Sequence, residues 1–108
     1  DSGILRVVTY NILLDQNCNT DWCLANLYPH CPPEAASVHQ RAPLIAEELA
    51  AYRPSIACLQ EVSRSVFQEY IKPRLEAHSS LECLFGERPA GGDWGLAVLY
   101  DASRFEII

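Results

Sequence analysis

Three polar residues at the ends of two apolar runs have side chains that could bind a metal ion. Gln60 and Glu61 follow the apolar residues 56–59, and Asn11 follows the run 4–10. A carboxylate at the end of a buried strand costs free energy unless a partner such as a cation binds it. Mg²⁺ and Mn²⁺ accept carboxylate and amide oxygens, with water and phosphate in the remaining positions. Glu61 is therefore the first candidate ligand; the alternative for a lone strand-end Glu is that it simply emerges into water.

The elements around these residues predict that Asn11 and Glu61 lie close together. Residues 4–10 and 56–61 are rich in the residue types that favour strands. Between them, apolar residues at helical spacing predict an amphipathic helix: Val38, Ala42, Ile45, Leu49 and Tyr52. A strand, a helix and a second strand form a βαβ unit, whose strands are parallel neighbours. Their carboxyl ends share one edge of the sheet, where open α/β sheets bind their ligands.

The remaining elements complete an α/β pattern. Residues 14–33 form an irregular segment with one helical turn expected over 21–27. A second helix follows Glu61, and Pro73 should bend or divide it because proline lacks the N–H that a helix needs. Its core face carries Phe67, Ile71 and Leu75. Three further strands are predicted, over residues 81–86, 95–100 and 105–108.

Length and charge narrow the classes of function. The chain has 108 residues, 49% of them hydrophobic, and a formal net charge of -6. This is the size of one small globular domain, and no apolar run is long enough to cross a bilayer, so we expect a soluble protein without a membrane partner. The acidic balance excludes a broad basic face for unspecific nucleic-acid binding. A phosphate-rich substrate would therefore need divalent cations to supply positive charge.

The five cysteines predict reduced thiols in an intracellular protein. Their number is odd, and Cys58 lies within an apolar strand, where a buried thiol is ordinary. Cys18, Cys23 and Cys31 crowd one segment together with His30, but their spacing fits no structural zinc pattern.

Three segments resemble successive motifs of the endonuclease/exonuclease/phosphatase superfamily. They are Val8-Thr9-Tyr10-Asn11-Ile12-Leu13, Leu59-Gln60-Glu61-Val62 and Gly95-Leu96-Ala97-Val98-Leu99-Tyr100. Within the superfamily, residues 27–33, the helix 41–49 and parts of 66–77 resemble the poly(A) deadenylase branch. They look most like the 2′-phosphodiesterases that degrade 2′,5′-linked oligoadenylates and mitochondrial poly(A) tails.

The resemblance implies a two-sheet α/β sandwich and Mg²⁺-dependent hydrolysis of phosphodiesters in RNA or oligoadenylate, with Mn²⁺ as a possible substitute. In the family, the residue matching Glu61 holds the catalytic metal, and the residue matching Asn11 lies beside it and contacts metal or phosphate. Glu61 and Asn11 are thus the expected catalytic and metal-binding residues, and Gln60 is expected to support them. The resemblance also implies a cytoplasmic or mitochondrial protein.

The later motifs of the family, an Asp-x-Asn pair and a terminal Asp-His pair, have no counterpart in residues 1–108. We therefore expect these residues to form the N-terminal portion of a single domain that continues downstream of Ile108, and the fragment alone to be inactive. Two alternatives stay open. Abasic-site endonucleases, sphingomyelinases and inositol-phosphate phosphatases share the Asn and Glu motifs, and a non-catalytic α/β interaction module needs neither.

Overall fold

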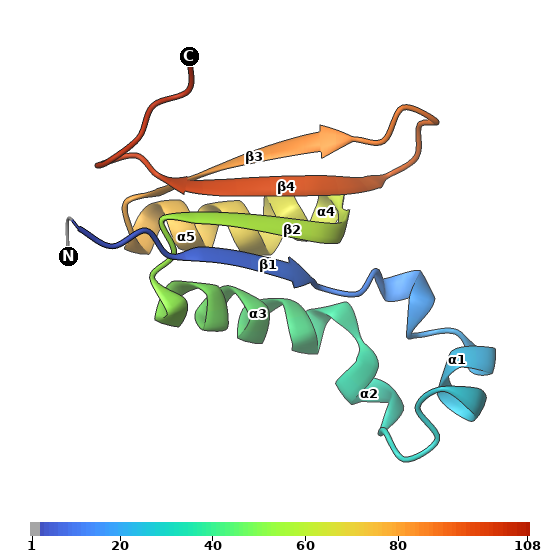
Figure 1. The fold of residues 1–108 in the computed structure, drawn as a ribbon. Helices are drawn as coiled ribbons and strands as arrows, with labels where there is room; N and C mark the ends of the chain where they lie inside the picture. Colours follow the sequence, from blue (N-terminus) through green and yellow to red (C-terminus); the bar gives the residue numbers. More distant parts are fainter. Residues whose placement is uncertain (1–2) are drawn as a thin grey trace.

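A four-stranded mixed sheet organises the protein in the computed structural model, which describes residues 3–108. The strands are β1 (Val7–Asn11), β2 (Ile56–Ser63), β3 (Leu81–Glu87) and β4 (Trp94–Asp101). Their order in the sheet is β1-β2-β4-β3, with β1 parallel to β2 and the other pairs antiparallel (Figure 1). The predicted α/β class and the parallel pairing of the first two strands are confirmed.

Residues 3–108 contain five α-helices, and some of them cover one face of this sheet (Figure 1). They are α1 (Asp21–Asn26), α2 (Pro33–Ala36), α3 (Val38–Tyr52), α4 (Arg64–Val66) and α5 (Lys72–His78). The helix α3 and the α4–α5 segment pack under the strands, whereas α1 and α2 extend beyond the carboxyl end of β1 (Figure 1). None of the helices within residues 3–108 has the length and apolar character needed to cross a bilayer.

The hydrophobic core lies between the sheet and these helices. On α3 the buried positions are Ala42, Ile45, Ala46 and Leu49, at helical spacing, and they pack against inward-facing residues of the strands. The other face of the sheet remains open and apolar, with Val7, Leu84 and Leu96 each about half exposed or more. In a two-sheet sandwich a second sheet covers such a face. The sheet formed by β1 to β4 therefore has the apolar surface expected of one of the two sheets.

Residues 105–108 are not a strand, and that prediction is wrong. Their apolar composition suits a strand, but residues 102–104 form a turn that leads the chain away from β4 (Figure 1). A strand requires a neighbour to receive its hydrogen bonds, and no described strand lies beside these residues.

Pro73 divides the second helical segment, as predicted. Between α4 and α5 the chain makes a π-helical turn over Phe67–Ile71, in which the Lys72 N–H donates to the carbonyl of Phe67. The wider turn accommodates Pro73, which has no N–H to donate to the preceding turn. Phe67, Ile71 and Leu75 all remain buried, so the segment keeps one face against the sheet.

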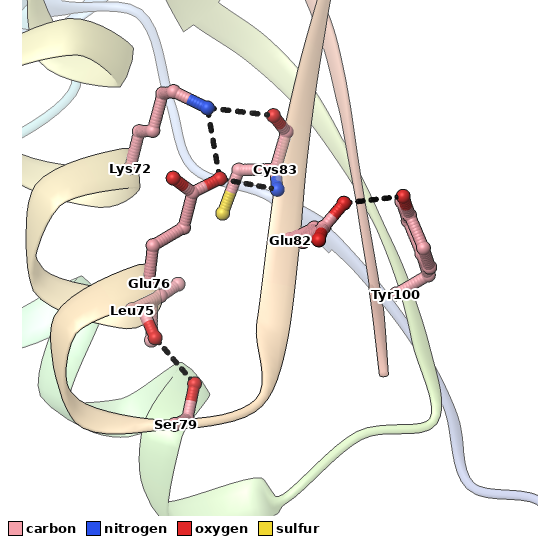
Figure 2. A network of polar contacts seen from close by, with 7 residues as sticks. All are labelled: Lys72, Leu75, Glu76, Ser79, Glu82, Cys83 and Tyr100. Atoms are coloured by element: carbon pink, nitrogen blue, oxygen red, sulfur yellow. Dashed lines mark hydrogen bonds and ion pairs between the residues drawn. The ribbon is translucent and has the colours of Figure 1, made fainter. Parts of the chain in front are cut away.

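Side chains of α5 form hydrogen bonds with main-chain groups of β3, which is an edge strand of the sheet (Figure 2). The Lys72 ammonium binds the Glu76 carboxylate at 2.8 Å and the Cys83 carbonyl at 3.4 Å, and Glu76 accepts the Cys83 N–H at 3.0 Å. An edge strand with free main-chain groups invites pairing with another chain. The Lys72–Glu76 pair therefore both anchors β3 and protects its edge.

Replacing Glu76 by Ala is expected to lower the free energy of unfolding by about 1–2 kcal/mol, because the Cys83 N–H loses its acceptor. Glu76→Gln keeps an acceptor and loses only a partly exposed ion pair, so about 0.5 kcal/mol is expected. Urea unfolding of both variants measures the difference. Equal losses of unfolding free energy in both variants would show that the ion pair with Lys72, and not the hydrogen bond from the Cys83 N–H, stabilises the protein.

The loss of stability in Glu76→Ala should depend on pH. The hydrogen bond from Lys72, and to a smaller extent the one from the Cys83 N–H, holds the pKa of Glu76 below its usual value of 4.5. A lowered folded-state pKa contributes stability above the unfolded-state value, and this contribution is lost as the pH falls through the folded-state pKa. The difference between wild type and Glu76→Ala should therefore shrink below pH 4.5.

Candidate functional site

The carboxyl ends of β1 and β2 bring Asn11 and Glu61 into direct contact. The parallel register sets Asn11 opposite Gln60, and the Asn11 side-chain amide donates to one oxygen of the Glu61 carboxylate at 2.7 Å. The proximity that the βαβ pattern predicted is therefore confirmed. The metal-binding and catalytic roles of these residues stay a prediction.

Glu61 lies within β2 rather than at its end, so the predicted end of this strand is wrong. Leu59 pairs with Ala97 and Val62 with Gly95, which leaves Gln60 and Glu61 opposite a single residue of β4. This is a β-bulge, and Glu61 adopts a left-handed φ of 56°. In a regular strand Glu61 would share the core face of Leu59. The bulge removes its carboxylate from the core and returns Val62 to it, fully buried.

The segment after β1 surrounds the Glu61 carboxylate with donors. The second carboxylate oxygen accepts the Leu14 N–H at 3.2 Å and the Asn17 side-chain amide at 2.6 Å. Leu13 has a φ of 65°, and its N–H donates to the Asn11 side-chain oxygen at 3.0 Å. This left-handed residue turns the chain so that the Leu14 N–H points at Glu61.

These donors keep Glu61 charged. The hydrogen bond from Asn11, followed by those from Asn17 and the Leu14 N–H, lowers the pKa of the Glu61 carboxyl below 4.5, against the opposing effect of burial. Glu61 is therefore ionised at neutral pH. An ionised carboxylate held by fixed donors has the chemistry of an oxygen ligand for a cation.

Arg41 of α3 holds the segment that supplies these donors. Its guanidinium donates to the carbonyls of Ile12 and Leu13, both at 2.8 Å, and to that of Ala36 at 3.0 Å. No carboxylate in the described part of the chain forms an ion pair with it. The planar fork of arginine can serve several carbonyls at once, which a lysine cannot do. Arg41 thus ties α3 to the turn after β1.

Gln60 lies at the site through its main chain rather than its side chain. Its carbonyl accepts the Ile12 N–H at 3.1 Å, which continues the β1–β2 ladder to the first residue after β1. Its side-chain amide instead donates to the Thr9 hydroxyl at 3.1 Å and to the Cys58 carbonyl at 3.0 Å. The supporting role predicted for Gln60 stays a prediction.

Sequence patterns did not identify Asn17 and Arg41. Asn17 lies in the irregular segment after β1, within a single 3₁₀ turn, Asp15–Asn17, where no periodicity marks its partner. Arg41 falls on an amphipathic helix, on which polar residues are usual. Their place in the sequence was the one indication of a role at the site, because both lie close to elements that end there.

The donor set suits a hard divalent cation. Glu61 supplies one carboxylate and Asn11 an amide, and residues 3–108 contain no group of three His, Cys, Asp or Glu side chains that could hold a metal on its own. Magnesium typically binds one or two carboxylates, keeps several waters and takes phosphate oxygens from the substrate. Structural zinc sites need four protein ligands. The residues present therefore fit Mg²⁺ or Mn²⁺.

No family model matches the chain, but individual proteins resemble it closely. The chain is 39% identical over all 108 residues to 2′,5′-phosphodiesterase 12 of Bos taurus and covers 17% of that protein. It is 38% identical over 77 residues, 71% of its length, to carbon catabolite repressor protein 4 homolog 2 of Arabidopsis thaliana, and covers 12% of that relative. The chain thus spans less than a fifth of these relatives.

Solved structures share its fold. ANGEL2, described as a 2′,3′-cyclic phosphatase, superimposes with a TM-score of 0.82 at 27% identity, over 96% of this chain and 29% of its own. An endonuclease/exonuclease/phosphatase family protein of Bacteroides thetaiotaomicron superimposes with a TM-score of 0.61 at 24% identity, over 96% of this chain and 32% of its own. The second likeness concerns the fold alone.

Proposed function

The chain resembles, over its whole length, a segment of proteins from the deadenylase branch of the endonuclease/exonuclease/phosphatase superfamily, and we propose that it contributes half of the active site of a Mg²⁺-dependent phosphodiesterase. The proposed substrate is adenylate-rich RNA, either a 2′,5′-linked oligoadenylate or a poly(A) tail. The name of the 2′,5′-phosphodiesterase relative and its 39% identity support this substrate class.

The single observation that carries the proposal is the ionised Glu61 carboxylate, which accepts one hydrogen bond from Asn11 at the end of β1 and two from the segment after β1. Fixed donors hold both carboxylate oxygens in place, so the group need not reorganise when a cation or a phosphate arrives. Asn11 is the natural second contact because it already touches Glu61 and ends the neighbouring strand.

Glu61 and Asn11 would hold the cation, and the bound Mg²⁺ would neutralise phosphate oxygens and stabilise the leaving alkoxide. The residues of this chain position the Glu61 carboxylate. The β-bulge at Glu61 places the carboxylate near the carboxyl ends of β1 and β2, and the segment after β1 fixes its orientation. The positive charge of a cation is needed there because the protein carries a net charge of -6.

A second candidate substrate is a 2′,3′-cyclic phosphate. The likeness to ANGEL2, described as a 2′,3′-cyclic phosphatase and also solved with adenosine-2′,3′-vanadate, favours it. Opening a cyclic phosphate is also a phosphodiester hydrolysis, so the same carboxylate and cation would serve. The two candidates differ only in the substrate, and an assay can separate them.

The test is hydrolysis by the full-length protein of three substrates: a 2′,5′-linked adenylate trimer, a 3′,5′-linked oligoadenylate and an oligoadenylate ending in a 2′,3′-cyclic phosphate. We expect release of adenosine monophosphate from at least one linear substrate, abolished by EDTA and restored by Mg²⁺. Turnover of the cyclic end alone would favour the second candidate. A folded full-length protein that hydrolyses none of the three would point to a non-catalytic module.

A further inference from the structure

A cavity with a volume of about 680 Å³ lies at the opposite end of the sheet from Glu61, near the start of β2. Ser55 directly precedes β2, and Glu61 lies six positions further along the chain, which corresponds to roughly 20 Å along a strand. The cavity is therefore separate from the candidate metal site. Its lining includes Arg6, Arg53, Arg104, Ser55, Ser80 and Asp101.

Positive charge is concentrated in this cavity, whose lining has three arginines and one carboxylate, Asp101. Of the eight Lys and Arg residues in the chain, three line it, and within residues 3–108 none of these three guanidinium groups forms an ion pair. Arg6 donates to the Tyr52 carbonyl and Arg104 to the Ile4 carbonyl, each through one nitrogen, so further donors remain on both. The described residues offer no acceptor to the Arg53 side chain.

The carboxylate that lines the cavity is already engaged. One oxygen of Asp101 accepts hydrogen bonds from the Ser80 hydroxyl at 2.8 Å, the Ser103 hydroxyl at 2.6 Å and the Ser103 N–H at 3.0 Å. These contacts fold the turn after β4. Asp101 is therefore a structural group of that turn, and the charge balance of the lining remains positive.

Ser55 adds a buried donor without an acceptor. Its side-chain oxygen accepts the Arg6 N–H and a guanidinium N–H of Arg104, both at 3.0 Å, which uses its two lone pairs. No described oxygen accepts the hydroxyl hydrogen, although Ser55 is only 3% exposed. Buried polar groups normally have partners for their donors. The Ser55 hydroxyl can therefore donate to an acceptor from outside the described residues.

We propose that this cavity binds a phosphate group. Guanidinium groups match the geometry of phosphate oxygens, and charge-assisted hydrogen bonds to them are among the strongest in proteins. Three arginines and the Ser55 hydroxyl line this cavity in a protein whose net charge is -6. The phosphate can be a free ion or the terminal phosphate of a nucleotide, and the site is independent of the proposed hydrolysis at Glu61.

The test is calorimetric titration of the full-length protein, in EDTA, with inorganic phosphate, adenosine 5′-monophosphate and adenosine. Removing divalent cations excludes phosphate held through a metal at Glu61, so failure here says nothing against the hydrolase. We expect saturable binding of one phosphate, weakened by added salt. Tighter binding of the nucleotide than of phosphate, with none of adenosine, would assign the site to a nucleotide phosphate. Equal binding would assign it to the free ion.

Arg53→Asn is the decisive variant. Arg53 has a left-handed φ of 50°, a conformation that Asn tolerates well, so the substitution removes the charge without disturbing the backbone. We expect at least about tenfold weaker phosphate binding, typical of one lost charge-assisted contact. The control Arg74→Gln removes the same charge from an arginine that pairs with Glu47 elsewhere on the surface, and should change affinity less than about twofold. Equal weakening by both variants, or no binding by wild type below about 10 mM phosphate, would overturn the proposal.

Discussion

Glu61→Ala in the full-length protein is expected to reduce Mg²⁺-dependent turnover of oligoadenylate by a factor of hundreds or more, which corresponds to about 3 kcal/mol or more in the activation free energy. The reason is that Glu61 is the carboxylate that accepts hydrogen bonds from Asn11 and from the segment after β1. Without it, the donors of Asn11 and Asn17 face each other with no acceptor between them, and the cation loses its only described carboxylate ligand.

A matched control separates this effect from a general loss of acidic charge. Glu69 is an exposed carboxylate on the π-helical turn and accepts no hydrogen bond from described residues. Glu69→Ala should leave turnover within about twofold of wild type, because exposed charges far from a site contribute little. Unchanged turnover in Glu61→Ala would remove Glu61 from the mechanism. A comparable loss in both variants would point to an effect of overall charge.

Arg41→Ala is expected to lower the free energy of unfolding by about 2–4 kcal/mol and to raise the Mg²⁺ concentration needed for half-maximal turnover several-fold. The substitution leaves the carbonyls of Ile12 and Leu13 without their donor. The turn that carries the Leu14 N–H and Asn17 then loses its anchor to α3. The effect on the site is indirect, so Mg²⁺ dependence should change more than the KM for oligoadenylate.

Two further variants test this positioning role. Arg41→Lys keeps the charge but reaches fewer carbonyls, so we expect it to fold and to show an intermediate shift in Mg²⁺ dependence. Arg74→Ala, on the exposed surface of α5, should lower stability by less than about 1 kcal/mol and leave Mg²⁺ dependence unchanged. If Arg41→Lys folds and responds to Mg²⁺ as wild type does, Arg41 has no positioning role at the site.

The sequence was sufficient to predict that Asn11 and Glu61 meet. Apolar strands and an amphipathic helix form a βαβ unit, and its topology forces the ends of both strands to one edge of the sheet. It was not sufficient to predict how Glu61 leaves the core. The bulge depends on the register between β2 and β4, and an antiparallel register is set by pairing over the whole strand rather than by local residue types.

Residues outside the repeating patterns were not predictable for related reasons. Asn17 and Arg41 act through side-chain hydrogen bonds to groups distant in sequence, at separations of 44 residues for Asn17 and of 29 and 28 residues for Arg41. Such contacts leave no periodicity. The incorrect strand at 105–108 shows the converse, because apolar composition alone does not provide a neighbouring strand.

The most direct test of the central claim, that Glu61 is the carboxylate ligand of a divalent cation, is a Mn²⁺ titration of the full-length protein followed by electron paramagnetic resonance. It needs no substrate and therefore does not depend on the substrate class. Glu61→Gln keeps the size of the side chain and removes its charge. We predict that wild type binds Mn²⁺ in competition with Mg²⁺ and that Glu61→Gln binds it at least about tenfold more weakly. The same affinity and stoichiometry in both proteins would contradict the claim.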